Sequence, residues 1–316
     1  MSERLCRILH CDLPIQLAPM GSVSASARLP AAVAAAGGHA MYPGLALPPS
    51  ALAPVLDELA SGTSAFGVNF IVPFMDPDSL SAAIERAPYI DFFLADPQPR
   101  LVERVHAGNA VCGWQVESVE EARAAEAAGC DVVIAKAWES GGRKRIEGPT
   151  LLALLDAVLN AVTVPVVAAG GIATARGVAA VLAAGADGAR VGTRFIAAAE
   201  SDAHPAWVEA VIAADANEAV VSTVFNAGLP EPGPHRVLRR SIEAAEALAD
   251  THAGIIRLAG LELPVPRFSP QPPTRESTGA IAAMPFYAGQ SVGAVRAVQP
   301  AAEIVAELAA GVSRFT

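Results

Sequence analysis

Eight short apolar runs, most of them followed by an alanine-rich segment, recur along the first 200 residues. An apolar run bounded by small or turn-forming residues is typical of a buried strand, and alanine favours helix. The predicted strands are residues 15–20, 38–43, 65–72, 89–96, 110–116, 132–137, 164–170 and 188–195. Strands joined by helices pair in parallel through right-handed crossovers, so the pattern predicts a parallel α/β fold.

Eight such units fit a (β/α)8 TIM barrel, in which a closed ring of parallel strands is surrounded by helices. An open, doubly wound sheet has the same order of elements, and counting strands does not exclude it. A partial internal repeat supports regular units. The stretches "AAGCDVVIAKA" (127–137) and "AAGADGARVGT" (183–193) both place Ala-Ala-Gly-x-Asp before a strand, with each glycine predicted to end a helix.

The rhythm changes after residue 200, where proline-rich loops separate the regular segments. Residues 1–200 are therefore predicted to form the barrel, and residues 201–283 a smaller, mostly helical domain. Residues 284–316 contain a glycine turn and a final alanine-rich helix, and are predicted to return to the barrel.

Composition excludes several classes of protein. A hydrophobic fraction of 53% with 17% charged residues excludes disorder throughout the chain. There is no apolar run of about eighteen residues, so no membrane span is expected. The first residues have no apolar core typical of a secretory signal, which favours a cytoplasmic protein. The net charge of −10 argues against binding to nucleic acid.

The four cysteines, Cys6, Cys11, Cys112 and Cys130, have neither the spacing of a disulfide framework nor that of a zinc site. Cys112 and Cys130 fall in or beside apolar strands and are expected in the core. No metal site is predicted.

Two glycine-rich turns, in "AAGGIATARG" and "VGTR", follow the last two predicted barrel strands. Gly170 and Gly171 leave backbone N–H groups uncovered, and the helix that begins near Thr174 adds the positive end of its dipole. Gly192 and Thr193 offer another bare amide and a hydroxyl. Barrels often bind phosphate at these two loops, so a phosphorylated ligand is predicted. The alternative is that the glycines only make plain turns.

Two other strand ends carry residues suited to a flat ligand. Met20 and Gly21 leave the first strand, where bare backbone can run along a ligand edge. Asn69 lies on the third strand and can both donate to and accept from a heteroaromatic ring. A strand asparagine satisfied by neighbouring backbone is the structural alternative.

The sixth predicted strand ends on Lys136. A flexible basic loop follows it, "ESGGRKR", which contains Gly141, Gly142, Arg143, Lys144 and Arg145. Lys136 therefore faces the rim where barrel enzymes hold their ligands. A lysine there could also form a Schiff base, as in class I aldolases, or extend into solvent.

Taken in order, these stretches resemble the nitronate monooxygenase (nitropropane dioxygenase) family. The matching segments are "PIQLAPMGSVS", "AAVAAAGG", "FGVNF", "AAGCDVVIAKAWESGG", "PVVAAGGIATARGVAAVLAAGADGARVGTRF", "ESDAHPAW" and "YAGQSVG". The family consists of FMN-dependent barrels related to flavin-dependent enoyl-thioester reductases. The resemblance implies FMN as cofactor, a small-molecule substrate in a cleft between two domains, O2 or NAD(P)H as co-substrate, and a homodimer.

By this resemblance, the flavin would be contacted by Met20, Gly21, Asn69, Lys136, Gly141, Gly170, Gly171, Gly192 and Thr193, with Gln290 approaching from the returning segment. Lys136 would point its ammonium at the pyrimidine edge of the flavin. A reduced flavin is negatively charged there, so this cation would raise the electron affinity of the cofactor. The ordered match decides against the aldolase interpretation.

One position departs from the family pattern. The loop after the sixth strand usually reads Gly-Gly-His, and here it reads Gly141-Gly142-Arg143. Arginine stays protonated and cannot act as a base, but it can bind a nitronate through a bidentate fork. Lys144 could replace the base only if burial lowers its pKa. His39, expected at the same rim, is another candidate catalytic residue.

The histidines His204 and His235 are expected to orient loops outside the barrel. Three functions follow from the resemblance. The first is an FMN-dependent enzyme that oxidises alkyl nitronates with O2, with Lys136 and Arg143 in its site. The second is an NAD(P)H-dependent flavin reductase acting on a quinone or an enoyl thioester. The third is a flavin-binding protein without turnover.

Overall fold

The computed structural model describes the whole chain except residues 1, 45–46, 145–146, 259–260 and 316. Eight strands pair in parallel in the order β1-β9-β8-β6-β5-β4-β3-β2. They are β1 (Ile15–Leu17), β2 (Ala40–Pro43), β3 (Phe66–Ile71), β4 (Tyr89–Phe93), β5 (Val111–Val116), β6 (Val132–Lys136), β8 (Val166–Ala169) and β9 (Gly188–Val191). All eight predicted strands are confirmed, with trimmed ends.

The two outer strands of this order, β1 and β2, meet through His39, which closes the sheet into a barrel. The N–H of Leu17 donates to the carbonyl of His39, and the N–H of His39 donates to the carbonyl of Ile15, both at 2.9 Å. The predicted TIM barrel is therefore confirmed, and the open doubly wound sheet is excluded.

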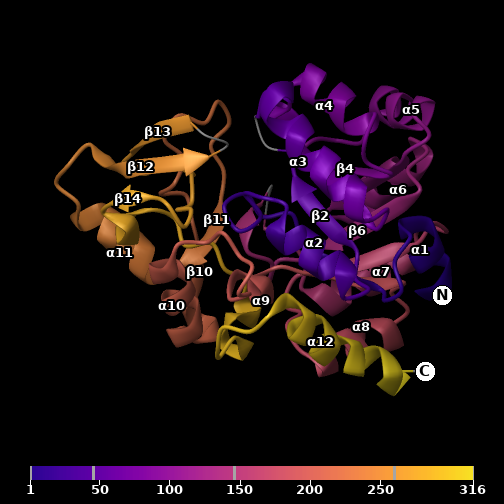
Figure 1. Cartoon of the computed structure of the whole chain (residues 1–316). Helices are drawn as coiled ribbons and strands as arrows, with labels where there is room; N and C mark the ends of the chain where they lie inside the picture. Colours follow the sequence, from indigo (N-terminus) through magenta and orange to yellow (C-terminus); the bar gives the residue numbers. More distant parts are fainter. Residues whose placement is uncertain (1, 45–46, 145–146, 259–260, 316) are drawn as a thin grey trace.

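Helices surround the strands in the expected alternation (Figure 1). They are α2 (Arg28–Ala35), α3 (Pro49–Gly62), α4 (Pro77–Ile84), α5 (Pro99–Ala107), α6 (Val119–Ala127), α7 (Leu151–Leu159) and α8 (Ala175–Ala183). The repeated Ala-Ala-Gly-x-Asp stretches act as predicted. Gly129 and Gly185 have φ of 93° and 107° just after their helices, and Asp131 and Asp187 accept the N–H groups of neighbouring strands.

Each barrel strand is buried on both faces. On β6, Val133 and Ala135 belong to the core between strands and helices, whereas Val132 and Ile134 face the barrel interior. Helix α1 (Ser2–Leu9) adds Leu5 and Leu9 to that inner cluster. Apolar side chains therefore fill one part of the barrel interior.

Residues 201–283 form a unit beside the barrel that contains as much strand as helix (Figure 1). Its elements are α10 (Pro205–Ala213), β10 (Ala219–Ser222), β11 (His235–Leu238), α11 (Arg239–Ala247), β12 (His252–Leu258), β13 (Leu261–Pro266) and β14 (Thr278–Gly279), with the 3-10 turns η2 (Ala216–Glu218) and η3 (Ile281–Ala283). The expectation of a mostly helical unit was wrong. Prolines and glycines interrupt the apolar and polar alternation of these strands, so the sequence pattern did not reveal them. We call these residues the second unit.

One sheet of the second unit is extended by a strand from a barrel loop. The loop after β6 contains β7 (Gly142–Arg143), which pairs with β11 to complete a three-stranded sheet, β10-β11-β7. Strands β12, β13 and β14 form another sheet. The barrel loop and the second unit are therefore joined by backbone hydrogen bonds.

The last segment of the chain lies against helices of the barrel. After η4 (Gln290–Ala294), helix α12 (Ala301–Phe315) packs against α8 and α2 (Figure 1). Within the described residues, none of the helices has the length and apolar character needed to span a bilayer. The division at residues 200 and 283 stays a proposal.

Candidate functional site

The turn after β8 brings uncovered backbone against the loop after β6. Gly170 and Gly171 have φ of 106° and 70°, which side chains rarely adopt. A Cβ added at Gly170 would lie 3.0 Å from the nitrogen of Ser140 and 3.3 Å from the carbonyl oxygen of Ala137. Only glycine fits this close approach without strain.

The returning segment lies between the loop after β6 and the end of β9. The N–H of Gly289 donates to Thr193 Oγ1 at 2.9 Å, and the N–H of Gln290 donates to the carbonyl of Glu139 at 2.9 Å. A Cβ on Gly141 would lie 2.8 Å from the Gly289 nitrogen. Gly141, Thr193 and Gln290, which are far apart in the sequence, are thus brought together.

Met20 and Gly192 form a neighbouring part of the rim. A Cβ on Gly192 would lie 3.3 Å from Met20 Sδ and 3.2 Å from Ala18 Cβ. Gly192 precedes the short helix α9 (Thr193–Ile196), whose first residue is the predicted Thr193. Gly21 follows Met20 in a turn.

Lys136 ends β6 in a largely buried environment, with 8% of the residue exposed. Its Nζ donates to Glu117 Oε1 at 2.7 Å and to the carbonyl oxygen of Arg143 at 2.7 Å. It also lies 4.3 Å from the centroid of the Phe93 ring. The ammonium is therefore fixed, and the interpretation of Lys136 as a lysine extending into solvent is excluded.

Asn69 belongs to a polar network inside the barrel. Its Nδ2 donates to Asp91 Oδ1, and Asp91 is ion-paired with Arg190. Arg190 Nε donates to Gln16 Oε1 at 2.7 Å. This network provides a charge-balanced layer of hydrogen bonds in the barrel interior.

His39 is not at the predicted position. It precedes β2, so it lies at the N-terminal start of the strand, whereas the rim is formed by C-terminal ends. The side chain is 1% exposed, and its Nδ1 is 2.9 Å from Gln16 Nε2. Burial lowers the pKa of His39 to about 3. The expectation that His39 opens on the rim was wrong, and the residue has a structural role.

Arg143 points toward the second unit. Its Nη2 donates to the carbonyl of Glu231 at 2.5 Å, and its Nη1 lies 3.5 Å from His235 Nε2. The guanidinium lies against Gly233, where an added Cβ would be 2.8 Å from Nη2. Arg143 has no ion pair among the described residues, although the charge of Glu231 acts on its guanidinium.

The sequence analysis expected His235 outside the site. In the structure, His235 lies on β11 and pairs with Arg143 of β7. Its Nδ1 is 3.2 Å from the hydroxyl of Tyr287, which donates to the carbonyl of Pro270 at 2.7 Å. Burial, and then the charge of Arg143, lower the pKa of His235 to about 4. His235 and Arg143 are 92 residues apart, so no local pattern could have linked them.

Lys144 is 1% exposed and lies behind the same loop. Its Nζ donates to Ser140 Oγ at 2.9 Å and lies 5.0 Å from the Trp138 ring centroid. Burial, and then the charge of Lys136, lower the pKa of Lys144 to about 6. A pKa lowered by burial is the condition under which the sequence analysis allowed Lys144 to replace the base. The third base, Arg145, lies outside the described residues.

The other titratable candidates have ordinary structural roles. His204 Nδ1 accepts the N–H of Ala206 at the start of α10, as expected for a loop-orienting residue. Cys112 and Cys130 are buried, as predicted. In the described part of the chain, no group of three or more His, Cys, Asp or Glu could hold a metal ion.

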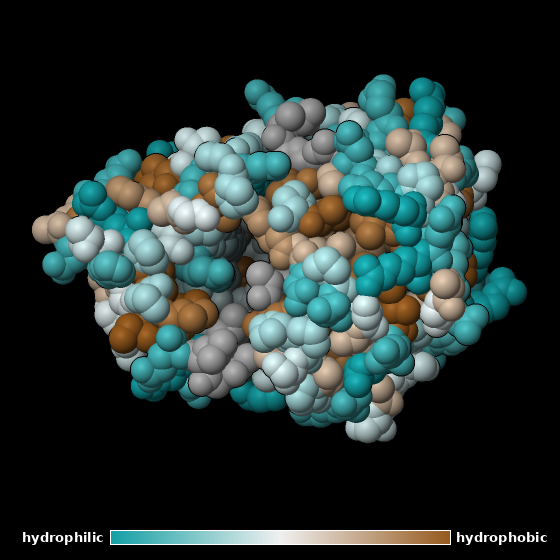
Figure 2. All heavy atoms as spheres, turned by 90° about the horizontal axis from the view of Figure 1, so that it is seen from above, coloured by the Kyte–Doolittle hydropathy of each residue, from teal (hydrophilic) through white to brown (hydrophobic). Residues whose placement is uncertain are grey.

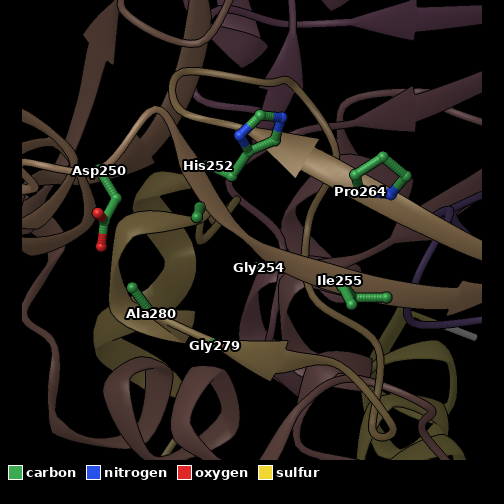
Figure 3. Close-up of a pocket in the computed structure, with 8 residues that line it drawn as sticks. Asp250, His252, Gly254, Ile255, Pro264, Gly279 and Ala280 are labelled. Atoms are coloured by element: carbon green, nitrogen blue, oxygen red, sulfur yellow. The ribbon is translucent and has the colours of Figure 1, made fainter.

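Seen from above, the surface is hollowed between the second unit and the barrel (Figure 2). A separate, open cavity of about 480 Å³ lies on β12, β13 and β14, near Asp250 and His252 (Figure 3). None of the residues that line this second cavity is a predicted site residue. The candidate site is therefore the rim of the barrel that faces the second unit.

Comparison with known proteins agrees with this arrangement. The family model described as nitronate monooxygenase matches residues 76–311, which is most of the chain. The chain belongs to the nitronate monooxygenase family. It is thus an oxidoreductase of a flavin-dependent family, and the resemblance seen in the sequence is confirmed.

Two solved structures are similar to this chain over nearly its whole length. FabK from Thermotoga maritima is 28% identical with a TM-score of 0.78, covering 98% of this chain and 96% of that protein. Nitroalkane oxidase from Streptomyces ansochromogenes is 28% identical with a TM-score of 0.77, covering 99% of each chain.

A further relative of this nitronate monooxygenase family member carries a different name. The (3aS,4S,5R,7aS)-5-hydroxy-7a-methyl-1-oxo-octahydro-1H-indene-4-carboxyl-CoA dehydrogenase of Mycobacterium tuberculosis is 32% identical over 243 residues. The match covers 75% of this chain and 66% of that protein. The relatives therefore include a named oxidase and a named dehydrogenase, and the family alone does not define the substrate.

Proposed function

We propose that this family member binds FMN and oxidises alkyl nitronates with O2. The observation that carries the proposal is the cluster of uncovered backbone at the ends of β8 and β9, next to the buried ammonium of Lys136. Gly170 and Gly171 have positive φ, and Gly192 has no Cβ beside Met20.

The residues present fit a flavin phosphate. Anions are bound by backbone N–H groups where no Cβ intervenes, and the positive end of a helix stabilises them further. Helix α8 begins at Ala175 after these glycines, and Thr174 Oγ1 caps it by accepting the N–H of Gly177. The proposed contacts are Met20, Gly21, Asn69, Lys136, Gly141, Gly170, Gly171, Gly192, Thr193 and Gln290.

The flavin would supply the two-electron redox capacity, and the protein would supply charge and orientation. Lys136 places a fixed positive charge where the cofactor ring is proposed to lie, which stabilises a reduced, anionic ring. Arg143 offers a second cation on the side of the second unit, suited to an anionic substrate.

The candidate proton acceptors of this site are poorly suited to abstracting a proton from a substrate. Arg143 cannot accept a proton, and the low pKa of His235, about 4, makes it a weak base. Lys144 has a suitable pKa of about 6, but it is 1% exposed and donates to Ser140. A nitronate is already deprotonated, so we expect it to be a better substrate than the neutral nitroalkane.

The test is anaerobic mixing of the purified, FMN-loaded protein with propyl nitronate, and separately with NADH and NADPH. We expect the nitronate to bleach the flavin absorption, and air to restore it. Bleaching by the pyridine nucleotide alone would reject the proposal. The matched variant Lys136→Met should still bind FMN and show a lower reduction potential; an unchanged potential would remove Lys136 from the site.

The second candidate is an NAD(P)H-dependent reductase acting on an enoyl thioester or a quinone. The relative named as a CoA-ester dehydrogenase favours it. The same mixing experiment separates the two, and FMN that neither donor reduces would favour a binding protein without turnover. A homodimer and a cytoplasmic location also remain proposals from the sequence.

A further inference from the structure

The surroundings of Lys136 contain a residue that the sequence did not single out. Glu117 follows β5, and its Oε1 accepts a hydrogen bond from Lys136 Nζ at 2.7 Å. The two side chains are 10% and 6% exposed, so water screens the pair poorly. This is a buried ion pair at the rim of the barrel.

The ammonium is held from two sides. An ammonium has three N–H donors. One goes to the Glu117 carboxylate of the barrel, and one goes to the carbonyl oxygen of Arg143 on β7, at 2.7 Å. The Phe93 ring lies 4.3 Å from Nζ and restricts its position further. One donor is left for a ligand.

We propose that Glu117 is a positioning residue of the redox site, which aims the Lys136 ammonium and partly offsets its charge at the flavin. The proposal rests on the proposed function, because it takes Lys136 to lie beside the cofactor. It goes beyond the proposed function because it assigns a second, opposing charge, that of Glu117, beside the Lys136 ammonium.

The physical argument is a balance of two charges. A lone buried ammonium would favour the reduced, anionic flavin strongly, because Coulomb interactions are large where water is excluded. The Glu117 carboxylate reduces that preference and also pairs a cation that would otherwise be costly to bury. The ion pair thus keeps the cation in place and sets an intermediate reduction potential.

The other acceptor connects this balance to the second unit. The carbonyl of Arg143 belongs to β7, and Arg143 is paired with His235 of β11. The orientation of Lys136 therefore depends on a barrel carboxylate and on a strand of the second unit. Only the carboxylate carries charge, so its removal isolates the electrostatic part.

The test is the variant Glu117→Gln, which keeps the shape and removes the charge. We expect FMN to stay bound and the reduced-to-oxidised ratio at a fixed potential to rise at least tenfold, which is about 30 mV for a two-electron couple. The control Glu120→Gln makes the same charge change on the exposed first turn of α6 and should leave the potential unchanged.

The Glu117→Gln change made in a Lys136→Met variant separates two effects of Glu117: positioning of Lys136, and direct electrostatic action on the flavin. In Lys136→Met protein, the same Glu117→Gln change should shift the potential less than it does in the wild type, because Glu117 then has no ammonium to aim at the flavin. If Glu117→Gln does not fold, Glu117→Asp replaces it; this variant keeps the charge at a shorter reach and should shift the potential in the same direction by less.

Two results overturn the inference. One is a reduced-to-oxidised ratio in Glu117→Gln that differs by less than threefold from the wild-type ratio at the same potential. The other is an equal shift in the wild-type and Lys136→Met backgrounds, because Glu117 would then not act through Lys136. Failure of the wild-type protein to take up FMN would instead reject the proposed function, so the two failures are distinguishable.

Discussion

The two sides of the candidate site hold their cations differently. On the barrel side, Lys136 is paired with Glu117. On the side of the second unit, Lys144 and Arg143 have no ion pair among the described residues, and their bonds go to neutral oxygen atoms of Ser140 and Glu231. The barrel side is therefore charge-balanced before any ligand binds, whereas the other side has positive charge available for an anion.

Burial, and then the nearby charge of Lys136, lower the pKa of Lys144 to about 6. A buried cation without a counter-ion is destabilised relative to its neutral form. An anionic substrate that approaches the second unit would supply the missing charge. The barrel side would then serve the cofactor, and the second unit would serve the substrate.

The largest expected contrast comes from replacing each lysine by methionine. Lys136→Met breaks the buried Lys136–Glu117 ion pair and should lower the free energy of unfolding by about 3 kcal/mol. Lys144→Met removes a buried amine that has to lose its proton in the fold at pH 7, and should raise the free energy of unfolding by about 1–3 kcal/mol. Chemical denaturation of both variants measures this contrast. Equal destabilisation by the two changes would contradict the comparison.

The pH dependence sharpens the same contrast. The folded-state pKa of Lys144, about 6, lies below the ordinary lysine value of 10.5, so between these values the unfolded chain binds more protons than the folded one. The free energy of unfolding should therefore rise with pH from about 6 toward 10 in the wild type. In Lys144→Met this rise should be smaller. A parallel profile for both proteins would show that Lys144 stays charged in the fold.

The next effect tests the barrel side alone. Gly170→Ala places a side chain at φ of 106°, 3.0 Å from the Ser140 nitrogen. The strain is about 1–3 kcal/mol, which corresponds to FMN binding weaker by roughly tenfold to a hundredfold if the turn relaxes away from the phosphate. Titration with FMN measures it. Gly62→Ala, at a site with open space around it, is the matched control and should bind FMN normally.

The barrel side was predictable because its signals are local. Apolar runs, helix-ending glycines and the glycine turns at residues 170–171 and 192 lie within the units that they shape. Lys136 was found because it ends a strand. The pattern located β2, but His39 stands at the N-terminal side of that strand, before Ala40, and only C-terminal strand ends form the rim.

The second-unit side was not predictable in the same way. His235 meets Arg143 only because β7 joins β11, across 92 residues of sequence. Glu117 meets Lys136 because β5 and β6 are neighbours in the barrel and both residues lie at strand ends. The first contact needs the tertiary fold; the second could have been found once the barrel was assumed.

A smaller effect tests the role of Arg143. Arg143→His should raise activity toward neutral nitroalkanes by roughly tenfold, because a well-positioned general base contributes about 10²–10⁴ and a newly introduced imidazole gains only part of that. The rate should then fall at acidic pH as the new imidazole becomes protonated. The same change should raise the KM for the nitronate, because a cation is lost. Steady-state kinetics with both substrates measures this, and no gain with the nitroalkane would indicate a pocket built for another substrate.

The smallest change keeps every functional group and moves only one. Gly233→Ala adds a Cβ 2.8 Å from Arg143 Nη2, so the guanidinium must shift, which a flexible side chain can do. We expect the KM for the nitronate to rise by roughly threefold, about 0.6 kcal/mol, with kcat and FMN affinity unchanged. Gly62→Ala again serves as the control. A change in FMN affinity instead of KM would mean that Arg143 serves the cofactor, and the division of labour between the barrel side and the second unit would not hold.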